Sequence, residues 1–250
     1  AIVAMHRPRD TDHHERARFH FAVREAATLF AAVERARRSR ALRKAATFPV
    51  DANLATRIER RIPLQLTDDQ RAAVRELWTR LAGPAAAGVL LQGDVGTGKT
   101  AVAIATALAV LAKGAQVAFL APTELLAEQH RSVVAKWLAG SDVEVVSCTA
   151  SQRDADLRAP GPRLIFGTHA LLSTGVTIPR LGLVIVDEQH RFGVQQRMTL
   201  VQKGDNPHVL VMTATPIPRT QALVLFGDLD VVMLRHRPPG RRAVRAFHLA

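Results

Sequence analysis

Apolar residues in the first part of the chain recur at helical spacing. Five of them follow one another at spacings of three or four positions and therefore share one helix face: Phe19, Val23, Ala26, Phe30 and Val33. This spacing predicts a helix over residues 12–44. A connector is expected over residues 47–53, where proline and polar residues interrupt the pattern. A second helix is predicted from Asp68 to Leu81, because Thr67 is a favourable N-cap and acidic residues follow it in the first turn.

From Val89 onward, short apolar runs alternate with helical segments. The runs are continuous, as expected for strands of a sheet that is covered on both faces. Strand–helix alternation indicates a parallel sheet with right-handed crossovers. The predicted strands are residues 89–92, 116–121, 143–147, 163–166, 183–187 and 209–213. The expected fold is therefore an α/β lobe with a mainly parallel sheet, helices on both faces and an N-terminal helical extension.

Charge and composition narrow the class of protein only slightly. The formal net charge is +12, and residues 1–61 contribute +7 of it, with 14 Lys and Arg against 7 Asp and Glu. A basic region favours polyanions, but the same arginines would also suit a solvated helix face. The single cysteine, Cys148, excludes an internal disulfide and fits the cytoplasm. No apolar run approaches the roughly 20 residues that span a bilayer, so no membrane partner is expected.

A phosphate-binding loop is the most specific motif in the chain. It fits the pattern G-x-x-x-x-G-K-[ST], follows a predicted strand and opens a predicted helix. Its glycines let backbone N–H groups surround phosphates, and the helix N-terminus favours negative charge. Lys99 should reach the β- and γ-phosphates of ATP, and the Thr100 hydroxyl should bind Mg²⁺. The expected ATP-binding residues of the loop are Gly93, Asp94, Val95, Gly96, Thr97, Gly98, Lys99 and Thr100.

Two carboxylates end the predicted strand 183–187. In an open parallel sheet, ligands lie at the carboxyl ends of strands, so Asp187 should face the phosphate loop. Asp187 is then expected to hold Mg²⁺, and Glu188 to orient and deprotonate the attacking water. An acidic pair after a strand is common, and the phosphate loop upstream is what makes this pair informative.

The stretch around these carboxylates resembles motif II of the RecG family of superfamily 2 DNA helicases, which remodel stalled replication forks. Other stretches are similar to further motifs of that family in the same order: residues 66–70 to the Q motif, 121–130 to motif Ia, 167–172 to motif Ib, 187–197 to motif II, 212–220 to motif III, and 226–230 to the segment after it. The resemblance covers nearly the whole chain. It implies a RecA-like ATP-binding lobe over residues 62–235. Residues 1–61 would be a helical linker after a wedge domain, and residues 236–250 would begin the linker to a second lobe.

The resemblance also implies roles for individual residues. Gln70 would contact adenine. His190 would sense the γ-phosphate, although a plain hydrogen-bonded residue is the alternative. Coupling between ATP and DNA is expected at the motif III residues, for which a helix cap is the alternative: Thr213, Ala214 and Thr215. Four further residues would hold DNA phosphates without reading the base sequence: Thr123, Gly167, Thr168 and His169. The alternative is that each of them only caps a loop.

The expected partners are branched DNA, a second RecA-like lobe that carries an arginine finger, and the wedge domain. Without the second lobe, the chain should bind nucleotide weakly and turn it over slowly. Three other interpretations remain open: the related motor of the transcription-repair coupling factor, a P-loop ATPase that acts on protein or small molecules, and a non-catalytic binding fragment. Residues 195–197 and 226–230 favour the RecG family over the first. Leu64 stands where the Q motif often has an aromatic residue, which would weaken adenine stacking.

Overall fold

The computed structural model describes residues 5, 9–152, 156–173, 175–187, 204–214 and 229–238. The chain forms two compact units. One comprises Ala1–Leu42 with Ile217–Leu229, and the other comprises Arg43–Pro216 with Asp230–Ala250. None of the described helices is both long and apolar enough to cross a membrane.

The first unit contains the long helix α2 (Thr11–Ala41), which confirms the predicted N-terminal helix. Its N-cap is Asp10, whose carboxylate accepts a hydrogen bond from the His13 backbone N–H at 2.6 Å, and basic residues in its last turn suit the helix dipole. Two residues of the predicted apolar face, Phe19 and Phe30, are 73% and 56% exposed. The helical spacing was therefore informative about the helix, but these two side chains are not buried.

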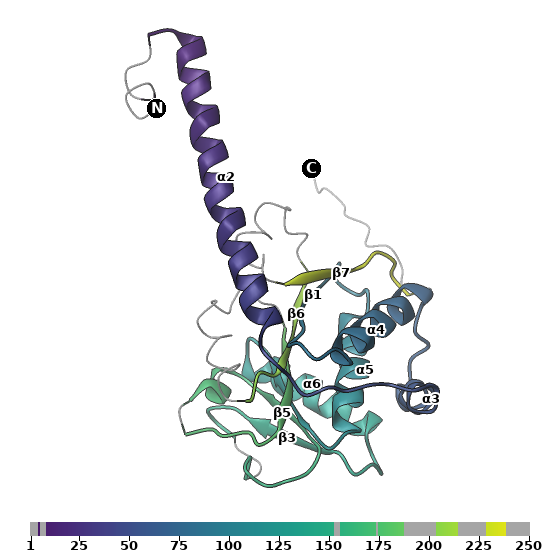
Figure 1. Ribbon diagram of the computed structural model, residues 1–250. Coiled ribbons are helices and arrows are strands. Elements are labelled where there is room, and N and C mark those ends of the chain that lie inside the picture. Colours follow the sequence, from purple (N-terminus) through teal and green to yellow (C-terminus); the bar gives the residue numbers. More distant parts are fainter. Residues whose placement is uncertain are drawn as a thin grey trace, which may run out of the picture. The chain divides into compact units, whose positions relative to one another are not determined.

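The second unit is built on a seven-stranded sheet in which every pairing is parallel. The strand order is β3-β4-β2-β5-β6-β1-β7. Figure 1 labels β7, β1, β6, β5 and β3, which follow one another in this order from top to bottom of the view. The bounds are β1 (Gly88–Gly93), β2 (Gln116–Leu120), β3 (Glu144–Cys148), β4 (Arg163–Gly167), β5 (Leu181–Val186), β6 (His208–Thr213) and β7 (Asp230–Leu234). The six predicted strands are confirmed. The seventh, β7, was not predicted, and it pairs with β1 at one edge of the sheet.

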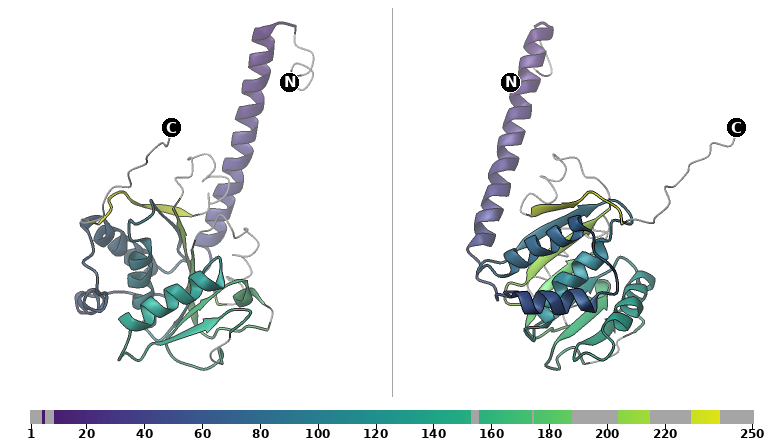
Figure 2. Two further views of the ribbon diagram at one scale, coloured as in Figure 1. Left: turned by 180° about the vertical axis from the view of Figure 1, so that it is seen from behind. Right: turned by 90° about the vertical axis from the view of Figure 1, so that its right-hand side faces the viewer.

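Among the described residues, the α-helices beside this sheet are α3 (Ala52–Arg61), α4 (Asp68–Leu81), α5 (Lys99–Leu111) and α6 (Glu124–Trp137). Figure 2 shows them gathered beside the sheet. Helix α4 has the predicted bounds and begins with a capping box, in which Thr67 and Gln70 each satisfy the other's backbone N–H. Helix α3 was not predicted as a separate element. Its N-cap is Asp51, and Leu54 and Ile58 bury one side of it.

Helix α5 lies at the centre of the core. It contacts four strands of the sheet and both α3 and α4, and all residues from Ala101 to Leu111 are buried. A helix enclosed in this way must be apolar all round, which explains its run of alanine, valine and leucine. On α4, the Trp78 indole N–H donates to the Ala105 carbonyl at 3.2 Å, so the polar end of this side chain is satisfied inside the core. This packing fixes the start of α5 against the end of β1.

The direction of the crossovers explains why both faces of the sheet are covered. The connections β1–α5–β2 and β2–α6–β3 both run toward the β3 edge. The connection from β4 to β5, which contains the 3₁₀ turn η1 (His169–Leu172), runs the other way. Right-handed crossovers in opposite directions lie on opposite faces. Leu171 and Ile178 of the latter connection are fully buried, so they cover the face opposite α5 and α6.

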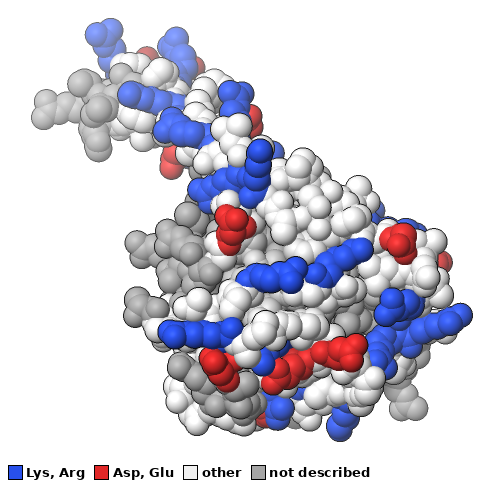
Figure 3. Space-filling model, turned by 60° about the horizontal axis from the view of Figure 1, so that its bottom comes forward, with Lys and Arg blue, Asp and Glu red and all other residues white. Residues whose placement is uncertain are grey.

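The amino edge of the sheet carries a cavity of about 750 Å³. Gly114, Val143 and Pro162 line it, and they precede β2, β3 and β4 respectively. Arg57 and Arg60 of α3 add basic groups to it. On the face drawn in Figure 3, Lys and Arg lie among Asp and Glu side chains.

Candidate functional site

The phosphate loop joins the end of β1 to the start of α5. Gly98 is the N-cap residue of α5, in the left-handed region with φ 83°, and makes no side-chain capping bond. Gly96 is also left-handed, with φ 84°. The first N–H groups of a helix have no partner within the helix, and here a glycine in place of a capping side chain keeps the approach to them open. Such an N-terminus is suited to phosphate.

The side chain of Lys99 folds back onto its own loop. Its Nζ donates to the Gly93 carbonyl at 2.7 Å and to the Asp94 carbonyl at 3.1 Å. The Thr97 hydroxyl also donates to the Asp94 carbonyl, at 2.9 Å. The loop is thus shaped by internal hydrogen bonds, and the ammonium group of Lys99 is held within it.

Gln70 ties helix α4 to this loop. Its Oε1 accepts from the Thr67 backbone N–H at 2.9 Å, and its Nε2 donates to the Thr97 carbonyl at 2.7 Å. Gln70 is only 3% exposed. Adenine contact by Gln70 remains a prediction, and the contacts that the structure describes are to backbone groups of the cap and the phosphate loop.

Asp187 and the phosphate loop lie at the same edge of the sheet. Strands β1, β6 and β5 are consecutive in the sheet and all parallel, so their carboxyl ends meet there. Neighbouring strands lie about 4.8 Å apart, which puts the axes of β1 and β5 about 10 Å from each other. Asp187 directly follows β5, and its backbone N–H donates to the Leu120 carbonyl at 2.9 Å. This arrangement allows the loop and the carboxylate to serve one magnesium–triphosphate.

The chemistry of the donor groups fits ATP and Mg²⁺. Gln70 packs closely against Gly98, since a Cβ there would lie 2.3 Å from Gln70 Nε2. The Thr100 hydroxyl and the Asp187 carboxylate are hard oxygen donors at one edge of the sheet. Mg²⁺ is usually held by one or two carboxylates together with substrate phosphates and water. Thr100 and Asp187 are therefore chemically suited to hold the ion, and this assignment stays a prediction.

Several predicted residues lie outside the described part of the chain: Glu188, His190 and Thr215. Their roles remain predictions. Of the motif III residues, Thr213 ends β6 and is buried, and Ala214 follows it. Because β6 lies between β1 and β5, Thr213 at its carboxyl end lies between the phosphate loop and Asp187.

The four residues predicted to contact DNA lie at or just after the ends of β2 and β4, in the other half of the same edge. Thr123 is exposed and caps α6, where its hydroxyl accepts from the Leu126 N–H at 3.3 Å. Gly167 ends β4 and Thr168 is buried, whereas His169 opens η1 and is exposed. The alternative role of Thr123 as a helix cap is thus observed. A DNA phosphate at Thr123 would have to bind the backbone, or a hydroxyl that also accepts from the Leu126 N–H.

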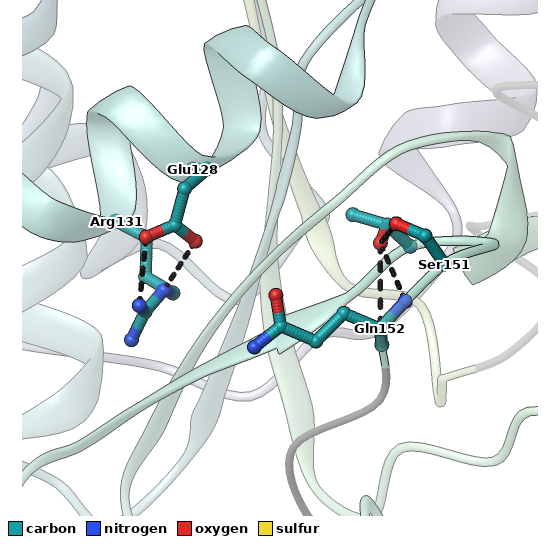
Figure 4. A network of polar contacts seen from close by, with 5 residues as sticks. Glu128, Arg131, Ser151 and Gln152 are labelled. Atoms are coloured by element: carbon teal, nitrogen blue, oxygen red, sulfur yellow. Dashed lines mark hydrogen bonds and ion pairs between the residues drawn. The ribbon is translucent and has the colours of Figure 1, made fainter.

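The loop after β3 is held by α6, which the sequence did not indicate. The Glu124 carboxylate accepts from the Ala150 N–H at 2.9 Å, the Ser151 N–H at 3.3 Å and the Ser151 hydroxyl at 2.5 Å. The Ser151 hydroxyl and these amides hold the pKa of Glu124 below its ordinary value. Figure 4 shows this loop at Ser151 and Gln152, and on α6 the separate pair of Glu128 with Arg131. The loop thus has a fixed place beside Thr123.

The segment after β7 is fastened to the nucleotide half of the edge. The Asp69 carboxylate accepts from the backbone N–H groups of Arg235, at 2.6 Å, and His236, at 3.1 Å. Burial alone would raise the pKa of Asp69, but these hydrogen bonds outweigh it and lower the pKa. Arg237 pairs with Asp94 of the phosphate loop, and its hydrogen bond is the main cause of a lowered pKa at Asp94.

Comparison with known proteins places this chain among helicases. The family model described as DEAD/DEAH box helicase matches residues 67–224. The ATP-dependent DNA helicase RecG of Synechocystis sp. is 42% identical over 98% of this chain and 30% of its own length. The RecG protein of Thermotoga maritima is 38% identical over 99% of this chain and 33% of its own length. The chain therefore spans about a third of the length of these relatives.

Solved structures agree with the sequence comparison. A structure of RecG bound to a three-way DNA junction has a TM-score of 0.78 at 36% identity, and the match covers 96% of this chain and 33% of that one. The helicase domain of Hef from Pyrococcus furiosus has a TM-score of 0.56 at 20% identity, over 72% of this chain and 40% of that one. The second likeness supports the fold alone.

Proposed function

Because the chain belongs to the DEAD/DEAH box helicase family, we propose that it is the ATP-binding lobe of a RecG-type motor that hydrolyses ATP and moves on branched DNA. The observation that carries the proposal is the meeting of the phosphate loop, Thr213 and Asp187 at the ends of three adjacent strands. The similarity to RecG proteins extends over nearly the whole chain and includes the structure with a DNA junction.

In the proposed reaction, the backbone amides of the phosphate loop cradle the β- and γ-phosphates, and Lys99 leaves its carbonyl partners to bind them. Thr100 and Asp187 hold Mg²⁺, directly or through water. The ion, when bound, neutralises charge that develops on the transferred phosphoryl group. Glu188 orients a water molecule and accepts its proton, and His190 responds to the γ-phosphate.

A second lobe is needed for fast turnover in this proposal. In related P-loop enzymes an arginine from a neighbouring element stabilises the transition state and contributes about 10³-fold or more in rate. The relatives are about three times as long as this chain, which leaves room for such a lobe and for a wedge domain in the whole protein. The 250-residue chain alone should bind nucleotide and hydrolyse it very slowly.

DNA would lie along the other half of the carboxyl edge. The loops after β2, β4 and β3 offer Thr123, Gly167 to His169, and the segment at Ser151 that Glu124 holds. Backbone N–H groups and hydroxyls at loops of this kind position phosphates without reading sequence. A DNA substrate and a single buried cysteine are consistent with a protein that acts in the bacterial cytoplasm.

The test measures ATP turnover and nucleotide binding by the 250-residue chain, with and without a three-way DNA junction. We expect Mg²⁺-dependent nucleotide binding that Lys99→Ala abolishes, together with slow turnover. Rapid DNA-stimulated hydrolysis by this chain alone would contradict the division of the site between two lobes. Junction binding that does not weaken with salt would count against DNA as the substrate, because phosphate contacts are strongly salt-dependent.

A further inference from the structure

A histidine that the predicted mechanism does not use contacts the predicted metal carboxylate. His130 Nε2 lies 3.1 Å from Asp187 Oδ2. The two residues are 57 positions apart, and their side chains are only 19% and 13% exposed. An ionised carboxylate can only accept hydrogen bonds, so the contact requires the proton of His130 to be on Nε2.

The ring of His130 is held in place by the core. It lies against Phe119 of β2, with ring centroids 5.1 Å apart, and Phe119 in turn packs on Phe166 of β4 at 5.0 Å. Both phenylalanines are fully buried. His130 therefore reaches Asp187 from a rigid support, and little side-chain freedom remains to be lost when the hydrogen bond forms.

The backbone of Asp187 is fixed from the same strand. Its N–H donates to the carbonyl of Leu120, the last residue of β2. The rotation of a carboxylate about its final bond is broad and soft, so fixing the backbone does not fix the oxygens. The hydrogen bond from His130 constrains one of these oxygens, Oδ2. Because a carboxylate has about four lone-pair sites on its two oxygens, accepting from His130 is compatible with binding a metal ion or a metal-bound water.

We propose that His130 is a positioning residue for the magnesium site, whose Nε2–H holds the Asp187 carboxylate in the orientation that serves the ion. The inference rests on the proposed function in one respect, the assignment of Asp187 as the metal carboxylate. Hydrogen-bond partners that orient metal ligands change metal affinity or activity by about 10–100-fold when they are removed. His130 should therefore set how tightly the divalent ion is held in the nucleotide complex.

The experiment measures the affinity of the chain for Mn²⁺, as a spectroscopic substitute for Mg²⁺, in the presence of a non-hydrolysable ATP analogue. Electron paramagnetic resonance of free Mn²⁺ gives the affinity without any turnover. His130→Ala removes ring and donor, His130→Phe keeps a ring against Phe119 without a donor, and His130→Gln restores an N–H donor. Gln129→Ala, an exposed neighbour on the same helix, is the matched control.

We expect His130→Ala and His130→Phe to weaken Mn²⁺ binding by about 10-fold or more, His130→Gln to recover part of it, and Gln129→Ala to leave it unchanged. Metal-free binding of the analogue should change little in all four. Wild-type affinity in His130→Phe would overturn the proposal, because packing alone would then explain the residue. Melting temperatures identify any variant that is unfolded, and His130→Phe preserves the test if His130→Ala does not fold.

Asp187→Ala separates this inference from the proposed function. If Asp187→Ala weakens Mn²⁺ binding and the His130 variants do not, the positioning role fails while the metal assignment stands. If Asp187→Ala leaves Mn²⁺ affinity unchanged, the metal assignment itself fails, and the role of His130 fails with it.

Discussion

Gly98 and Gln70 should be energetically coupled even when no nucleotide is bound. Gly98 has φ 83°, and a Cβ added there would lie 2.3 Å from Gln70 Nε2 and 3.2 Å from its Cδ. Gly98→Ala therefore has two separate effects on stability. It places an alanine in the left-handed region, and it displaces the Gln70 amide from the Thr97 carbonyl.

The two effects have different magnitudes. An L-residue in the left-handed region costs about 1–2 kcal/mol. Breaking the buried hydrogen bond from Gln70 to the Thr97 carbonyl costs about 1–3 kcal/mol. Gly98→Ala should therefore lower the free energy of unfolding by about 2–5 kcal/mol. In a Gln70→Ala background the same change should cost only the backbone part, because that hydrogen bond is already absent and the Cβ has room.

The assay is urea unfolding without nucleotide, followed by the fluorescence of Trp78 and Trp137 in the sheet unit. The double-mutant cycle should give a coupling energy of about 1–3 kcal/mol. Gly140→Ala is the control for backbone strain, since Gly140 has φ 70° and a Cβ there would meet nothing within 4 Å. Its effect should add to that of Gln70→Ala. The reasoning is refuted if Gly98→Ala costs no more than Gly140→Ala and is additive with Gln70→Ala to within about 0.5 kcal/mol.

Three further outcomes are expected. Glu188→Gln in the full-length enzyme should keep Mg²⁺-ATP binding and abolish hydrolysis, and unchanged turnover would move the base role elsewhere. Burial lowers the pKa of His208, whose Nδ1 accepts from the Ala87 N–H at 3.0 Å. The neutral ring therefore contributes stability above the ordinary pKa of 6.5 that is lost as the pH falls toward the lowered native value. The free energy of unfolding should therefore drop as the pH falls below 6.5, and a pH-independent value would contradict this. Asp69→Ala should release the segment after β7 and speed tryptic cleavage after Arg235, whereas Asp68→Ala should not. Equal cleavage rates in the two variants would show that the hydrogen bonds to Asp69 do not hold this segment.

The sequence was sufficient to locate the parts of the site that are local in the chain. Continuous apolar runs predicted six strands, and the glycine and lysine spacing predicted the loop between β1 and α5, because both signals arise within a few neighbouring residues. Strand β7 was missed although residues 231–234 form an apolar run, since only its alternate residues are buried and its pairing with β1 involves a partner about 140 positions away. Helix α3 was missed because Asp51 lay within the expected connector.

The contacts between distant segments could not be predicted. The motif Ia stretch contained Glu124 and His130, but nothing in their spacing shows that one accepts from Ser151 and the other reaches Asp187. Both contacts depend on the strand order, which brings β3, β4, β2 and β5 side by side. Gln70 was assigned to adenine by resemblance, whereas its observed partners follow from how α4 packs against the phosphate loop.

Helix α6 joins the two halves of the carboxyl edge mechanically. Glu124 in its first turn grips the loop after β3, and His130 contacts Asp187. The two residues are six positions apart, which is about 9 Å along the axis, and a helix over so short a span moves as a rigid rod. His130 also packs against Phe119 of β2, so a pull on the loop at Ser151 would reach the Asp187 carboxylate only by shifting α6 against the sheet. In the proposed motor, α6 therefore connects the half of the edge assigned to DNA with the half assigned to the ion.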